Sequence, residues 1–131
     1  MNQRPTSPHI GVYNFSYTMS LSILHRITGV AASVGFFMFA WWLMALASGP
    51  AAYATAMQAL SSPIAKLLLG GFTFSFIYHF CNGIRHLVWD TGRGLERTQA
   101  RRSGLFVIIA ALLLTGLVLW LGCAALTRGA A

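Results

Sequence analysis

The chain has 131 residues, of which 56 % are hydrophobic and 8 % charged, and its 9 Lys and Arg against 2 Asp and Glu give a net charge of +7. Because average soluble chains carry about 25 % charged residues, this composition excludes an ordinary soluble domain and indicates a membrane protein. The arginines cluster beside apolar runs, so orientation in a membrane explains the positive charge, and we expect contact with membrane lipid and no nucleic-acid partner.

The first segment, residues 1–21, is predicted to lie at the membrane surface. It is interrupted by Pro5 and Pro8 and carries tyrosines, whose apolar ring and polar hydroxyl favour the interface. It lacks the basic start, short apolar stretch and small-residue cleavage site of a signal peptide, and also the Arg- and Ser-rich pattern of a transit peptide. We therefore expect it to be retained, in a bacterial chain or in one already processed.

Three apolar windows approach or exceed the roughly 20 residues that cross a bilayer as a helix. We therefore predict an all-α fold in which residues 1–131 form a single transmembrane domain of three helices. The first should end at Gly49 and Pro50, and the second should begin at Pro63, since a proline is tolerated at a first helical position. A charge-free connection, 51–62, joins them. The three helices are expected at about 22–48, 63–90 and 104–126.

The second connection, 91–104, is the most basic part of the chain. By the positive-inside rule it faces the cytoplasm, or the matrix of an organelle. Three spans then place the N-terminus on that same side and the C-terminus on the opposite side. The expected location is the bacterial inner membrane, with the mitochondrial inner membrane as the alternative. The arginines of this connection are Arg93, Arg97, Arg101 and Arg102.

His79 is the candidate ligand of a cofactor. It lies six residues before Arg85, which puts it about 9 Å deeper in the membrane at the rise of an α-helix. One interpretation is a packing histidine bonded to a carbonyl of a neighbouring helix, and the other is an ion path, proton relay or cofactor ligand. Ser75 and Gly83 lie one turn to either side on the same stripe and leave space for a flat molecule.

A b-type haem fits this pattern, because imidazole ligates haem iron and the macrocycle lies between helices. No second histidine is expected at the depth of His79, so a second axial ligand would have to come from another subunit. Haem propionates need cations nearby. The candidates at a compatible depth are His25, Arg26 and Arg85.

Ser22 and Arg26 form a second candidate site, since residues four apart on a helix share one face. They could bind the carbonyl oxygens of a quinone ring; the alternative is an ordinary helix-start hydroxyl and an arginine that reaches lipid phosphates. His86 and Asp90 lie at the same depth and could supply protons. For Asp90 a salt bridge to a neighbouring arginine is an equal alternative, and the two roles do not exclude each other.

Three motifs resemble a known family. R-P-x-S-P-H at 4–9, S-I-L-H-R-x-T-G at 22–29 and H-x-x-N-G-I-R-H-L-x-W-D at 79–90 closely resemble the cytochrome b subunit, the larger membrane anchor, of succinate dehydrogenase, respiratory complex II. The pattern is similar to the mitochondrial and alphaproteobacterial branch. The resemblance implies a subunit of a succinate:ubiquinone oxidoreductase that takes part in electron transfer to ubiquinone, with no catalytic residue and no activity in this chain alone.

The resemblance also implies roles for individual residues. The histidine at the position of His79 is an axial ligand of haem b, which is shared with a second, smaller anchor subunit. Ser22 and Arg26 match residues of the ubiquinone site, which the iron–sulfur subunit and the second anchor complete. His25 matches a histidine near a haem propionate, and Asp90 belongs to the same neighbourhood. A flavoprotein subunit would oxidise succinate.

Two rival functions are compatible with the sequence. One is the anchor of a fumarate reductase, because this subunit does not set the direction of the reaction. The other is a small transporter or proton channel in which His79, His86 and Asp90 form a relay without a cofactor. The relay is disfavoured because the ionisable residues crowd one half of the membrane, and the far half offers only Lys66 near its edge.

Overall fold

The computed structural model describes residues 16–129. Within that range the chain forms four helices and no strand, and three of the helices are long and apolar enough to cross a membrane. The predicted fold class, an all-α chain with three membrane-spanning helices, is therefore confirmed. The helices are α1 (Tyr17–Ala47), α2 (Pro50–Leu60), α3 (Pro63–Asp90) and α4 (Arg97–Gly129).

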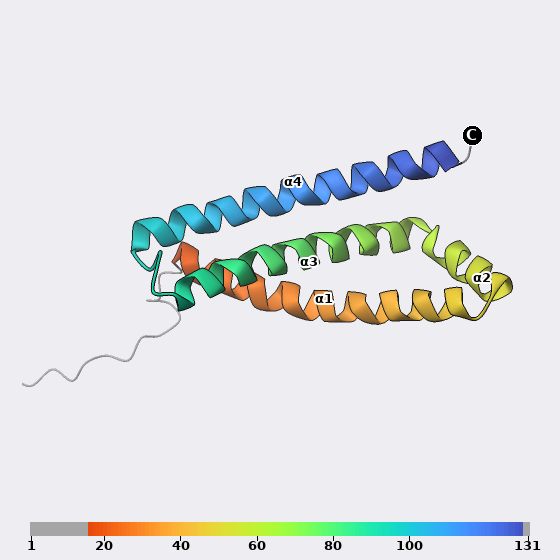
Figure 1. Cartoon of the computed structure of the whole chain (residues 1–131), viewed down its shortest axis with the longest axis horizontal. Helices are drawn as coiled ribbons and strands as arrows, with labels where there is room; N and C mark the ends of the chain where they lie inside the picture. Colours follow the sequence, from red (N-terminus) through yellow and green to blue (C-terminus); the bar gives the residue numbers. More distant parts are fainter. Residues whose placement is uncertain (1–15, 130–131) are drawn as a thin grey trace, which may run out of the picture.

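The three long helices lie side by side (Figure 1). α3 is the central one, since it packs against α1 on one side and α4 on the other, while α2 turns the chain between α1 and α3. The start of α1, the end of α3 and the start of α4 meet at one end of the bundle (Figure 1). We call this the arginine end, after Arg26, Arg85, Arg93, Arg97, Arg101 and Arg102.

The bounds of α3 are those predicted for the second span, and its start shows why. Ser62 precedes the helix in an extended conformation and its hydroxyl oxygen accepts a hydrogen bond from the Ala65 amide at 3.2 Å. Pro63 follows at the first helical position, where no backbone N–H is required. Where the bilayer boundaries cross these helices stays a prediction.

Two helix starts and one additional helix differ from the sequence expectation. α1 begins at Tyr17, inside the predicted surface segment, of which residues 1–15 lie outside the described part of the chain. The first connection contains the helix α2, because its alanine-rich residues favour a helix once Gly49, at φ 106°, has turned the chain. α4 begins at Arg97 rather than near Gly104, since arginine, glutamine and alanine are good helix formers.

The core lies mainly between α3 and α4. Its fully buried centre consists of Tyr78, Val107 and Ala111, with Leu24 of α1 packed against it. Most other large apolar side chains point outward, as expected of helices that face lipid or other subunits. Small residues allow close approach, because a Cβ on Gly104 would overlap the side chain of Leu21.

Candidate functional site

Three histidines from two helices gather at the arginine end. The ring of His25, on α1, stacks on His79 with 4.0 Å between centroids and an interplanar angle of 10°. Its other neighbour is His86, at 5.0 Å and 18°. The structure therefore brings together three of the predicted site residues, although they are far apart in the sequence.

The imidazole of His79 is fixed by the backbone of α1. Its Nδ1 lies 3.0 Å from the carbonyl oxygen of His25. Because a carbonyl only accepts hydrogen bonds, Nδ1 carries the proton and Nε2 keeps its lone pair. This is the arrangement commonly found in histidines that bind metals, where a hydrogen bond on one ring nitrogen orients the other.

An apolar pocket of about 260 Å³ lies beside the His79 ring between α1 and α3. One turn further along α3, a Cβ on Gly83 would meet no atom within 4 Å, so this side of the helix is open. The pocket thus combines mostly hydrophobic walls with one imidazole and the Ser33 hydroxyl. Its lining residues are Gly29, Ala32, Ser33, Phe36, Phe76, His79 and Phe80.

Three of the four predicted quinone and proton residues lie on the outside of the chain. Ser22 and Arg26 are both exposed on α1, and Asp90 is exposed as the last residue of α3. His86 is half-buried, and its Nδ1 lies 2.7 Å from the Asn82 carbonyl oxygen. These side chains are available to another molecule at the arginine end, and their roles remain predictions.

Arg85 points away from the histidines, toward α4. Six residues after His79, it lies roughly 120° around the helix, at about 100° per residue. Its Nε donates to the Ser103 hydroxyl at 2.9 Å and its Nη2 to the Ala100 carbonyl at 2.7 Å, and it is only 6 % exposed. The predicted contact of Arg85 with a haem propionate would have to compete with these bonds.

The polar contact between α3 and α4 was not predicted as a unit. Arg85 Nη1 also donates to the Asn82 side-chain oxygen at 3.2 Å, and its guanidinium lies 4.0 Å from the ring centroid of Trp89. Tyr78, one turn before Asn82, donates instead to a residue of α1, the Leu21 carbonyl, at 3.3 Å. The signal was the spacing of these residues, which repeat by three or four along a line distinct from that of His79 and His86.

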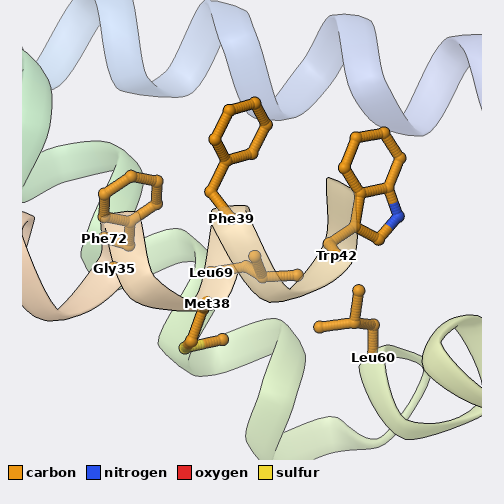
Figure 2. A pocket seen from close by; sticks show the side chains of 7 residues that line it. All are labelled: Gly35, Met38, Phe39, Trp42, Leu60, Leu69 and Phe72. Carbon is orange, nitrogen blue, oxygen red and sulfur yellow. The ribbon is translucent and has the colours of Figure 1, made fainter. Parts of the chain in front are cut away.

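A second apolar pocket lies at the α2 end of the bundle (Figure 2). It has a volume of about 260 Å³, and the only side-chain nitrogen or oxygen among its lining residues belongs to Trp42. Figure 2 shows this indole together with Phe39 on α1, and Leu60 where α2 ends. Because a quinone needs hydrogen-bond partners for its carbonyl groups, the arginine end is the better candidate.

The chain matches proteins of one family over most of its length. A family model described as succinate dehydrogenase/fumarate reductase transmembrane subunit matches residues 1–118. The succinate dehydrogenase cytochrome b556 subunit of Rickettsia prowazekii is 42 % identical over 119 residues, which are 91 % of this chain and 92 % of that protein. The corresponding b556 subunit of Paracoccus denitrificans is 38 % identical over 116 residues, 88 % of this chain and 89 % of that one.

A mitochondrial protein is similar to the same degree. The human succinate dehydrogenase cytochrome b560 subunit is 38 % identical over 114 residues, which are 86 % of this chain and 68 % of the human protein. These relatives are subunits of an enzyme complex, and three long apolar helices make this chain a multi-pass membrane protein. The chain therefore belongs to the family of succinate dehydrogenase/fumarate reductase transmembrane subunits.

Proposed function

We propose that this chain is the membrane anchor of a succinate:ubiquinone oxidoreductase that holds one haem b through His79 and builds part of the site of ubiquinone reduction. The observation that carries the proposal is the hydrogen bond from His79 Nδ1 to the His25 carbonyl at 3.0 Å. It leaves Nε2 as the free donor atom for iron, at the edge of an apolar pocket.

The residues around His79 fit a haem. Among residues 16–129 no group of three or more His, Cys, Asp or Glu side chains is arranged to hold a bare metal ion. The His25 and His79 rings are stacked, so they present their faces to each other and do not converge on a shared ion. A haem brings its own pyrrole nitrogens and needs only axial imidazoles from protein. The second imidazole would come from the second, smaller anchor subunit.

His25 is the best-supported propionate contact. Its Nδ1 is buried and has no hydrogen-bond partner among the described residues. An unpaired buried nitrogen is costly, so a polar group from outside the chain is expected there. Arg26, exposed on the next position of α1, would add its positive charge, and Arg85 contributes only if its bonds to α4 open.

Haem b supplies a reversible electron-transfer centre when it is bound. The chain's own residues would hold the quinone head group with the Ser22 hydroxyl and the Arg26 guanidinium, both of which donate hydrogen bonds to carbonyl oxygens. His86 and Asp90, at the same end of the bundle, would supply or relay the protons that the reduced ring takes up. The iron–sulfur subunit would deliver the electrons, and a flavoprotein subunit would oxidise succinate.

The proposed topology follows from the same arginines. With the arginine end on the cytoplasmic side of a bacterial inner membrane, or the matrix side in a mitochondrion, the soluble subunits would dock where Ser22 and Arg26 are exposed.

A fumarate reductase anchor would have the same architecture, so the quinone type and the haem potential distinguish the two directions. A proton channel is less well supported, because His79, His86 and Asp90 all belong to the half of α3 that ends at the arginine end.

The haem assignment is tested by His79→Ala in the assembled complex. We expect the reduced-haem α-band to be lost or strongly disturbed, because the iron loses one axial ligand. The measurement is a visible spectrum of the purified complex, oxidised in air and then reduced with succinate. An unchanged low-spin spectrum would refute the ligand assignment, and a wild-type complex without haem would favour a packing role for His79.

The quinone assignment is tested by Ser22→Ala and Arg26→Ala. Each removes a hydrogen bond worth roughly 1.5–3 kcal/mol where a charged group takes part, so turnover from succinate to ubiquinone should fall about tenfold or more for Arg26→Ala. Reduction of a soluble dye by succinate should be unchanged, since it needs only the soluble subunits. Equal loss of both activities would indicate failed assembly instead.

A further inference from the structure

Gly29 lies directly against the His79 imidazole. A Cβ built on Gly29 would be 2.8 Å from His79 Cε1 and 3.1 Å from Nδ1, closer than side-chain atoms normally approach. Gly29 also lines the apolar pocket beside the ring. The contact therefore involves the same face of α1 that would meet the cofactor.

The position of this glycine follows from helix geometry. In an α-helix the carbonyl of one residue points along the axis toward the residue four positions later. The carbonyl of His25 thus points toward Gly29, and a ring that binds this carbonyl from outside has to cross the surface of Gly29. A Cβ at that position would lie in the path of the ring, since it would be 3.1 Å from the Nδ1 that binds the carbonyl. The backbone here is already crowded, since the Thr28 hydroxyl lies 3.0 Å from the same oxygen.

We propose that Gly29 is a positioning residue for the iron-binding histidine: its missing side chain allows His79 Nδ1 to reach the His25 carbonyl, which fixes the tautomer and direction of the ring. The inference rests on the proposed role of His79. Because Gly29 has no side chain, it acts only through its effect on the His79 ring and is not itself a ligand.

The hydrogen bond should affect the haem as well as the ring orientation. A carbonyl that accepts the Nδ1 proton makes the imidazole a more basic ligand, which stabilises ferric more than ferrous iron and lowers the midpoint potential. A methyl group at position 29 would push the ring away and weaken this bond. The midpoint potential should therefore rise.

The experiment is Gly29→Ala in the full complex, with the haem midpoint potential and the electron paramagnetic resonance spectrum of the ferric haem as readouts. We expect a higher potential and shifted g-values at an unchanged haem-to-flavin ratio, or loss of haem if the ring is displaced completely. A wild-type potential and spectrum in Gly29→Ala would overturn the inference.

Two matched variants control for effects of an added methyl group. Gly70→Ala makes the same change on the helix of His79, where no neighbouring atom lies within 4 Å, and it should leave potential and spectrum unchanged. Gly35→Ala places a methyl group against the Phe72 ring, so it disturbs packing between α1 and α3 away from His79. It should lower thermal stability without shifting the haem spectrum of the assembled fraction.

A double-mutant cycle decides the case in which Gly29→Ala does not assemble. If Gly29 acts through the His79 ring, adding Gly29→Ala to His79→Ala should cause no further loss of assembled complex or of its thermal stability. An equal loss in both backgrounds would overturn the inference. If His79→Ala alone leaves the low-spin spectrum intact, it is the proposed ligand role that fails, which these measurements keep separate.

Discussion

The two sides of α3 near the arginine end differ in how their ionisable side chains are bonded. Toward α4, Arg85 uses its donors on neutral oxygen atoms of Asn82, Ser103 and Ala100, and the buried core of Tyr78, Val107 and Ala111 continues the contact. Toward α1, His25 has a buried nitrogen without a partner among the described residues, and a pocket lies beside His79.

The ionisable groups therefore differ in their bonding on the two sides. The Arg85 guanidinium is paired within the chain, because an unpaired buried charge costs more than the roughly 1–3 kcal/mol of an unpaired neutral group. Pairing is not complete on that side either, since the Nδ2 of Asn82 is buried without a partner among the described residues. If His25 serves a ligand, as proposed, its nitrogen is paired only when that ligand binds. Adjacent residues illustrate the division, since Tyr78 is fully buried in the core while His79 is half-buried beside the pocket.

The largest effect should come from Arg85→Met, which tests whether Arg85 serves the fold. The substitution keeps an apolar stem but removes three hydrogen bonds from a charged donor, so we expect the complex to lose roughly 2–4 kcal/mol of stability. A thermal unfolding scan of the purified complex measures the change. Arg85→Lys, which keeps the charge but not the planar donor group, should be intermediate.

The same variant distinguishes folding from a propionate contact. If Arg85 belongs only to the contact with α4, the haem potential of the Arg85→Met complex that does assemble should equal the wild-type value. Unchanged stability together with a shifted potential would show instead that Arg85 reaches a propionate.

A smaller effect is expected for Tyr78→Phe, next to the proposed iron ligand. The phenol donates a long hydrogen bond of 3.3 Å to the Leu21 carbonyl, so its removal should cost about 0.5–1 kcal/mol without a change in the haem spectrum. Thermal unfolding and a visible spectrum of the same sample check both parts. A spectral shift as large as that of a ligand variant would contradict the division of α3 into two sides.

The smallest effect on stability is expected for Gly83→Ala. The added methyl group meets nothing in this chain, and alanine favours a helix over glycine by roughly 0.5–1 kcal/mol, so the helix itself should not be weakened. If a haem lies against this open side, as predicted, the ratio of haem to flavin should fall. A complex with full haem content would mean that the macrocycle does not approach Gly83.

Part of this arrangement could be predicted from sequence. Hydrophobic length and Pro63 predicted the helix Pro63–Asp90, and the histidines were recognised as candidate site residues. Arg85, however, was grouped with His25 and Arg26 as a propionate candidate because of its depth alone. Its direction around the helix differs from that of the histidines. At about 100° per residue, His79, His86 and Asp90 fall within roughly 20° of one line whereas Arg85 is displaced by about 120°.

The neighbouring helix that each side of α3 contacts was not predictable in the same way. Both sides carry polar residues, and helical periodicity does not tell which neighbouring helix each side will meet. The decision depends on residues far away in the sequence, such as the small Gly29 on α1 and the Ser103 hydroxyl on α4. The helix α2 was missed for another reason, since its 11 residues are too few to cross a bilayer and the segment was therefore treated as a connection between two spans.

The short connection between α3 and α4 has a consequence for the order of assembly. The bonds of Arg85 span only 15 and 18 residues, whereas the bond from His79 to the His25 carbonyl spans 54. Short loops close at a lower entropic cost, so the α3–α4 hairpin is expected to form as a local unit. Docking of α1 then completes the surface around His79. A cofactor that enters at this late step would stabilise a long-range contact between α1 and α3 and leave the α3–α4 hairpin unchanged.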